Sequence, residues 1–67
     1  MFAERLMELF RTGARCRIFT VFGESTGTVG FCDGEELHFI GQGGNTFRLY
    51  CIDILQLEEF SSVPLNK

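Results

Sequence analysis

The stretch "GTVGFCDGEELHFI", which runs from Gly27 to Ile40, decides the fold. Two short apolar runs flank an Asp-Gly dipeptide, and Asp-Gly between such runs is the strongest short signal of a tight β-hairpin. Gly30 interrupts the first run, and a glycine inside a strand is typical of a bulge or a strong bend. The stretch therefore predicts strands at 28–32 and 37–40, joined by a turn at 33–36.

The segment before this hairpin predicts a helix over residues 2–11. Its apolar side chains recur at helical spacing and form one stripe, which consists of Phe2, Leu6, Leu9 and Phe10. Gly13 follows the last periodic residue, as is common where a helix ends.

The rest of the chain carries β signals. The run "RCRIFTVF" (15–22) is rich in β-branched and aromatic residues and predicts a strand, and "GESTG" (23–27) predicts a turn. A loop is expected at "GQGGN" (41–45), followed by strands at 46–51 and 52–60 with only a slight break between them.

The expected architecture is mainly β: an N-terminal helix and then a five-stranded, strongly bent antiparallel small barrel of the SH3-like type. Closure into a barrel would remove the exposed edges of so small a sheet. We expect one domain over residues 1–60, and a loose tail over 61–67, which contains Pro64.

The composition predicts a folded protein that associates with other copies of itself. Of the 67 residues, 45% are hydrophobic, which excludes a disordered chain. A domain of this size buries only about 60% of the surface of its unfolded chain, so a lone monomer would be marginally stable. The eight Phe side chains are a large apolar load for such a small interior. Part of this load is therefore expected on a surface that another subunit covers.

The three cysteines, Cys16, Cys32 and Cys51, are widely spaced and form no C-x-x-C motif. This pattern argues against a disulfide framework and against a zinc site, so we interpret them as buried strand residues in a reducing compartment. The start "MFAERLMELF" lacks a signal peptide's basic region and long apolar core, and no run has the length of a membrane span. We therefore expect a cytoplasmic protein with no membrane partner.

The formal net charge of −3 is a poor match for duplex DNA, whose binding relies on many Lys and Arg contacts to phosphates. Four of the arginines, however, lie in the first quarter of the chain: Arg5, Arg11, Arg15 and Arg17. A local basic patch for a single-stranded nucleic acid is compatible with this distribution.

Catalytic and cofactor motifs are not evident. His38 is the only histidine, and the serines lie in segments that predict turns or tail, where Ser commonly hydrogen-bonds locally. The acids of "DGEE" (33–36) offer too few ligands for a cation site, and "GQGG" (41–44) lacks the phosphate-loop pattern. We expect no enzyme activity, no metal and no cofactor.

Two segments jointly resemble the motifs of the Sm-like family, which includes the Sm, LSm and Hfq proteins. The first motif has a glycine, an apolar residue, an Asp and a later apolar residue at fixed spacing, matched here by Gly27, Val29, Asp33 and Ile40. The second has an apolar residue, an Arg, an Ile and a further apolar residue, matched by Phe47, Arg48, Ile52 and Leu55. The resemblance covers about Phe2 to Phe60 and implies an Sm-type barrel.

The sequence departs from the family at the positions that bind nucleotides. The family's Asn position holds Leu37, its stacking position holds Glu35, and the Gly after the Arg is Leu49. The RNA-binding candidates that remain are Arg48, which can pair with phosphate or stack on a base, and His38, which follows the lost Asn position. An equally acceptable interpretation is that Arg48 is a solvated strand residue or forms an ion pair with Glu35 or Glu36.

The resemblance implies a homo-oligomeric ring in which the fourth strand of one subunit, "TFRLYC", pairs with the fifth strand of the next, "DILQLEEF". The function it implies is weak binding of single-stranded RNA through the pore of the ring. The alternative is a protein-interaction or structural oligomerisation module with the same fold and no nucleic-acid partner.

Overall fold

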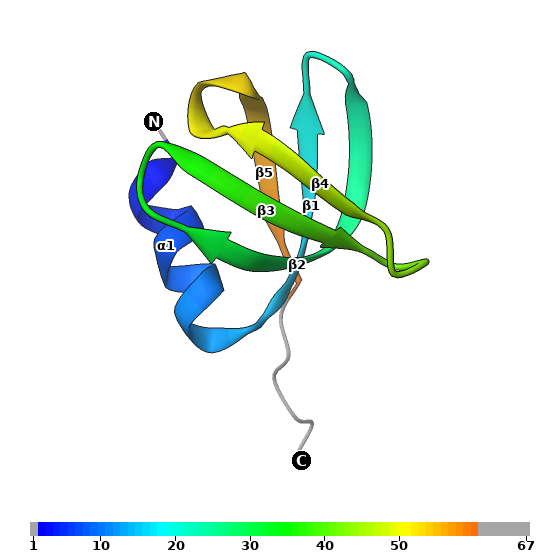
Figure 1. The fold of residues 1–67 in the computed structure, drawn as a ribbon, viewed down its shortest axis with the longest axis horizontal. Helices are drawn as coiled ribbons and strands as arrows, with labels where there is room; N and C mark the ends of the chain where they lie inside the picture. Colours follow the sequence, from blue (N-terminus) through cyan, green and yellow to red (C-terminus); the bar gives the residue numbers. More distant parts are fainter. Residues whose placement is uncertain (1, 61–67) are drawn as a thin grey trace.

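The fold of the chain was obtained as a computed structural model, which describes residues 2–60 (Figure 1). One helix precedes five strands, and a short 3-10 turn, η1, joins the last two strands. In chain order the elements are α1 (Ala3–Thr12), β1 (Arg15–Thr20), β2 (Gly23–Cys32), β3 (Glu36–Gly41), β4 (Thr46–Tyr50), η1 (Cys51–Asp53) and β5 (Ile54–Glu59). The tail predicted to be loose, 61–67, lies outside the described residues.

Helix α1 forms where the apolar stripe predicts it, shifted by one residue. Leu6 and Leu9 are buried, and Phe2 packs partly against the same core. Gly13 adopts a left-handed conformation with φ of 73°, and its N–H donates to the carbonyl of Leu9 at 2.8 Å, which ends the helix. Phe10 stays 41% exposed at the edge of the stripe.

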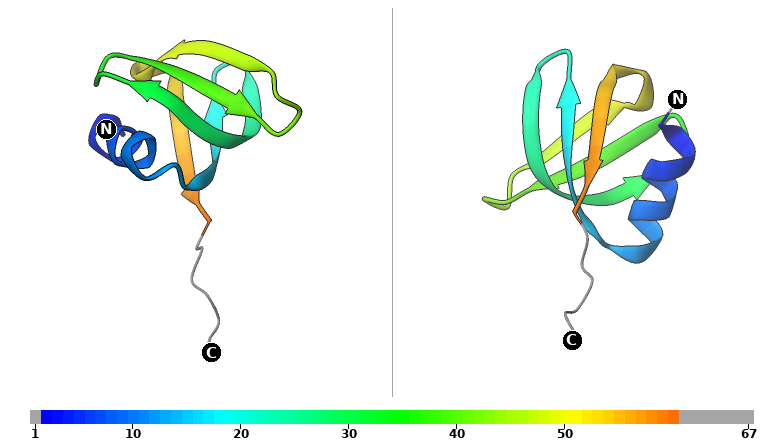
Figure 2. Two further views of the ribbon diagram at one scale, coloured as in Figure 1. Left: turned by 60° about the horizontal axis from the view of Figure 1, so that its bottom comes forward. Right: turned by 180° about the vertical axis from the view of Figure 1, so that it is seen from behind.

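The strands form one antiparallel sheet in the order β4-β3-β2-β1-β5. The prediction of a mainly β fold with five antiparallel strands is confirmed. The long strand β2 curves, so that β3 and β4 run across β1 and β5 (Figures 1 and 2). The predicted bulge at Gly30 is confirmed, because the register of β2 against β3 shifts between Val29 and Phe31. The order leaves β4 and β5 as the two edges of the bent sheet.

The prediction of a turn at 23–27 is wrong. Strand β1 ends at Thr20, and β2 already begins at Gly23, so the turn consists of Val21 and Phe22. The Thr20 hydroxyl stabilises this turn, since Oγ1 accepts from the N–H of Phe22 and donates to the carbonyl of Gly23, both at 2.9 Å. Gly27 is needed for strand pairing: a Cβ there would lie 1.9 Å from the carbonyl oxygen of Ile40, so only glycine allows β2 and β3 to approach this closely where they pair.

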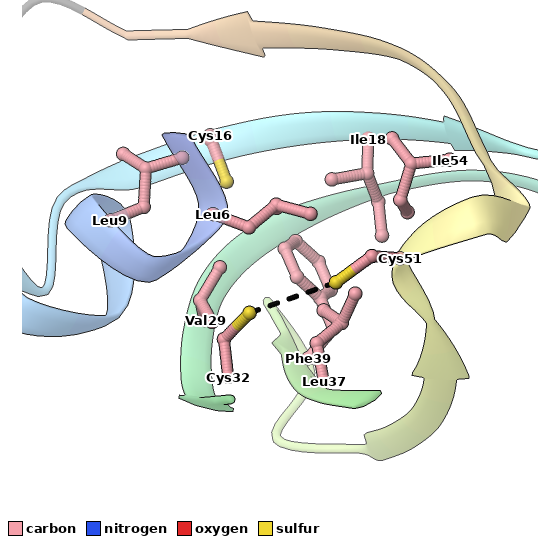
Figure 3. Packing of buried hydrophobic residues seen from close by; sticks show 10 residues of the cluster. All are labelled: Leu6, Leu9, Cys16, Ile18, Val29, Cys32, Leu37, Phe39, Cys51 and Ile54. Carbon is pink, nitrogen blue, oxygen red and sulfur yellow. Dashed lines mark hydrogen bonds between the residues drawn. The ribbon is translucent and has the colours of Figure 1, made fainter. Parts of the chain in front are cut away.

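The interior combines side chains from α1, from all strands except β4, and from η1 (Figure 3). Its ten buried residues are Leu6, Leu9, Cys16, Ile18, Val29, Cys32, Leu37, Phe39, Cys51 and Ile54. The predicted burial of all three cysteines is thereby confirmed, but Cys51 lies in η1 and not in a strand; none of the three is in a disulfide. Among residues 2–60, no helix is long and apolar enough to span a membrane.

Candidate functional site

The two predicted site residues face each other on the outer surface of the sheet. His38 in β3 pairs with Arg48 in β4, so their side chains lie on the same face. Alternation along β3 directs the neighbours of His38, Leu37 and Phe39, into the core, where both are fully buried. The structure thus brings the two candidates together.

Glu36 lies on the same face and contacts both candidates. Its Oε2 is 2.9 Å from Nε of Arg48 and 3.7 Å from Nε2 of His38. The Arg48 side chain is 73% exposed, so water screens this pair, yet the carboxylate occupies one side of the guanidinium. The prediction that Arg48 pairs with Glu35 or Glu36 is confirmed for Glu36, and an anion that binds Arg48 must compete with it.

Aromatic side chains extend this face from β4 back to the helix. The ring centroid of Phe31 lies 5.2 Å from that of His38, and Phe10 of α1 packs against Phe31 with its ring tilted by 63°. The motif resemblance does not identify Phe31, or Tyr50, which pairs with Glu36 across the sheet, as members of this face. Strict alternation along β2 would place Phe31 on the same face as the buried Val29, in the core. The bulge at Gly30 instead turns Phe31 to the outer face. The groups on this face can pair with an anion and stack on a planar ring.

The positions that depart from the Sm-like pattern have structural roles. Leu37 is fully buried and pairs across the sheet with the half-buried Leu49, so neither borders an open pocket. Glu35 lies in the exposed turn, where its carbonyl accepts a hydrogen bond from the N–H of Cys51 at 2.7 Å.

Asp33 fixes the turn between β2 and β3. Its Oδ1 accepts from the N–H of Glu36 at 2.8 Å and of Glu35 at 2.9 Å, and these hydrogen bonds lower the pKa of Asp33 below its ordinary value. Within residues 2–60, no three or more His, Cys, Asp or Glu side chains gather as a metal site would require. The carboxylate of Asp33 therefore has a structural role in this turn.

Two of the N-terminal arginines form a separate cluster. Arg15 and Arg17 lie on β1, which β2 and β3 separate from β4 in the sheet. Both guanidinium groups lie near the ring of Phe60, at 5.7 and 5.8 Å from its centroid, and Arg17 also pairs with Glu58. These arginines do not join Arg48 in one site.

An open groove separates β4 from the hairpin of β1 and β2. It encloses about 490 Å³ and is lined on one side by Phe47 and Leu49 and on the other by Ile18 and Phe22. Phe22 is 77% exposed, which is unusual for a phenylalanine in an isolated domain. The groove runs beside the edge strand β4.

Comparison with protein-family models, with curated proteins and with solved structures finds no match to this chain. The Sm-like resemblance rests on the motif residues and stays a prediction.

Proposed function

We propose that this chain is a self-assembling β module, in which the edge strand β4 of one copy pairs with the edge strand β5 of the next. The observation that carries the proposal is the pair of open edges at the two ends of the bent sheet. Edge strands present unpaired N–H and C=O groups, which readily pair with another strand. Because the two edges differ, such pairing is head-to-tail and closes into a ring if the rotation between copies allows.

Exposed apolar side chains at both edges support this arrangement. Phe47 is 41% exposed and Tyr50 is 56% exposed on β4, while Ile52 and Leu55 beside the other edge reach 80% and 62%. Side chains of a neighbouring β5 can fill the groove between β4 and the hairpin of β1 and β2. The same pair of strands joins subunits in the Sm-like family that the sequence resembles, which is a second, independent support.

A charge placed at one edge tests this proposal. Leu55→Glu introduces a carboxylate beside β5, and we expect it to reduce the oligomer to smaller species, as measured by light scattering. Val21→Glu is the matched control, because Val21 is 58% exposed in the turn between β1 and β2 and lies on neither edge strand. An oligomer that survives Leu55→Glu, or that dissociates equally in both variants, would contradict pairing through β5.

A second candidate function is weak binding of single-stranded RNA. The observation that favours it is the row of Phe31, His38 and Arg48, which offers aromatic surface beside a cation. In an assembly each copy contributes one such row, so the cations are repeated around the particle. Glu36 opposes binding, and the family's Asn and stacking positions hold Leu37 and Glu35, so we expect low affinity and little base preference.

Fluorescence anisotropy with labelled oligo-U and oligo-A tests the RNA candidate. The affinity should fall steeply as salt is raised, because phosphate contacts release counterions. Arg48→Ala should abolish binding while the oligomer stays intact. Arg11→Ala is the control, since Arg11 is as exposed as Arg48 and likewise paired with a glutamate, Glu8. If the wild-type protein binds neither oligonucleotide at low salt, RNA binding is excluded and self-assembly is the remaining proposed function.

A further inference from the structure

Two of the three buried thiols are in direct contact. The Sγ atoms of Cys32 and Cys51 are 3.8 Å apart, within reach of an S–H···S hydrogen bond (Figure 3). Both residues are free cysteines and nearly inaccessible, with exposures of 6% and 5%. The two sulfur atoms need to approach by a little under 2 Å to reach the disulfide bond length of about 2.05 Å.

The backbone around the pair is fixed on both sides. Cys32 is the last residue of β2, directly before the turn that Asp33 holds. Cys51 is the first residue of η1, and its N–H donates to the carbonyl of Glu35 in that same turn at 2.7 Å. The contact between the two thiols therefore follows from the packing of η1 against the β2–β3 turn.

The third cysteine lies apart from this pair. Cys16 is on β1, packed near the helix, and no thiol contact involves it among the described residues. Burial, with a smaller contribution from the charge of Glu59, raises its pKa to about 11. The geometry thus selects one of the three cysteine pairings that the sequence allows.

We propose that Cys32 and Cys51 form a site of reversible oxidative modification, at which a small disulfide such as glutathione disulfide converts the two thiols into one intramolecular disulfide. The bond ties the end of β2 to η1, the connection between β4 and β5. It is formed within one chain, so the inference does not rest on self-assembly or on RNA binding.

The reaction proceeds by two thiol–disulfide exchanges. One thiol of the pair loses its proton and attacks glutathione disulfide, which forms a mixed disulfide and releases one glutathione. The second thiol then loses its proton and attacks the protein sulfur of the mixed disulfide, which releases the other glutathione. The two thiol protons end on the two glutathione molecules, and the electron pair that reduces glutathione disulfide comes from the two cysteine sulfurs.

The surroundings predict that this reaction is slow in the closed structure. Burial, followed by the hydrogen bond with Cys32, raises the pKa of Cys51 to about 12, so the reactive thiolate is scarce near neutral pH. Access requires η1 to open. This three-residue turn contains the exposed Ile52, and its opening breaks backbone hydrogen bonds that join it to Glu35 and Val21, so the reaction requires local unfolding.

Equilibration of the full-length protein in a glutathione redox buffer tests the proposal independently of the reaction rate. After alkylation of the remaining thiols, the intact mass should equal that of the chain minus two hydrogen atoms plus one alkyl group. A chain with three free thiols would instead carry three alkyl groups. Cleavage after Arg15, Arg17 and Arg48 places the cysteines on three different tryptic peptides, 16–17, 18–48 and 49–67. We expect 18–48 linked to 49–67, and reduction should separate them.

Variants supply the controls. Cys16→Ser should form the same link, and in both proteins oxidation should raise the thermal midpoint of unfolding, because the cross-link restricts the unfolded chain. Cys51→Ser should show neither the link nor the rise. Should that variant fail to fold, the peptide map of the wild-type protein decides alone. A link to Cys16, a bond between chains, or three free thiols at equilibrium would overturn the proposal.

Discussion

The Nε atom of Arg48 lies 2.9 Å from Oε2 of Glu36, so the exposed cation of the candidate site already has an anionic partner. The same carboxylate oxygen is 3.7 Å from Nε2 of His38. Any phosphate at this face must displace Glu36 from Arg48 or share the guanidinium with it. Glu36 therefore limits the affinity of the face for anions.

Removal of this charge should strengthen RNA binding if the second candidate function is correct. We expect Glu36→Gln to tighten oligo-U binding at low salt by up to about fivefold, since exposed ion pairs contribute roughly 0.2–1 kcal/mol. Glu35→Gln is the control, because it changes the charge equally in the same turn without touching Arg48. Equal effects of the two variants in the anisotropy assay would show that only overall charge matters.

Gly27→Ala should destabilise the protein strongly. Its Cβ would lie 1.9 Å from the carbonyl oxygen of Ile40, and β2 cannot move away without losing its pairing with β3. We expect a loss of about 3 kcal/mol or more in the free energy of unfolding. Gly43→Ala serves as control, because a Cβ there meets nothing within 4 Å, and its effect should stay within about 0.5 kcal/mol. Urea unfolding measures the stability of both variants, and similar midpoints would contradict the close approach of Gly27 to Ile40.

Introduction of an Asn at position 37, where the Sm-like pattern has one, should be costly. Leu37 is fully buried in the core, so Leu37→Asn removes apolar contacts and buries an amide. We expect the free energy of unfolding to fall by about 3 kcal/mol. Val21→Asn, at an exposed turn residue, should change it by less than about 0.5 kcal/mol. If Leu37→Asn unfolds at the wild-type urea concentration, position 37 is not in the core.

Asp33 should make stability depend on pH in the acid range. Its pKa is lowered in the folded protein by the N–H groups of Glu36 and Glu35, so the ionised form stabilises the fold. That contribution is fully present above the ordinary pKa of 3.8 and is lost as the pH falls through the lower folded value. Thermal midpoints of the wild type and Asp33→Ala should differ near neutral pH and converge in strong acid.

The control for this experiment is Glu35→Ala, which removes a carboxylate of the same turn that accepts no backbone hydrogen bond among residues 2–60. Its midpoint should follow the wild type across the acid range. A difference between wild type and Asp33→Ala that is independent of pH would assign the effect of Asp33 to something other than its charge.

Much of the fold follows from local patterns in the sequence. The helical stripe locates α1, and a glycine between apolar residues locates the bulge at Gly30. The turn of β1 and β2 was misplaced because glycines usually mark turns, whereas Gly27 is required by a contact with Ile40. That contact joins residues far apart in the sequence, so no local pattern contains it.

The candidate site was predictable only in part. Arg48 and His38 were identified from the motif resemblance and from composition, and a possible ion pair with Glu36 follows from their charges. The alignment of His38 with Arg48 depends on the register of β3 and β4, and the position of Phe31 depends on the bulge. Register and bulge geometry are set by the packed sheet, which is why Phe31 and the contact between Cys32 and Cys51 emerge only from the structure.

The mass of the wild-type protein in solution tests the central claim of self-assembly most directly. Light scattering on a size-exclusion peak at micromolar concentration should give a defined multiple of the 7.6 kDa chain mass, because the edges β4 and β5 are then paired between copies. Circular dichroism on the same fractions reports whether the chain is folded. A folded species of 7.6 kDa throughout that concentration range would contradict the account.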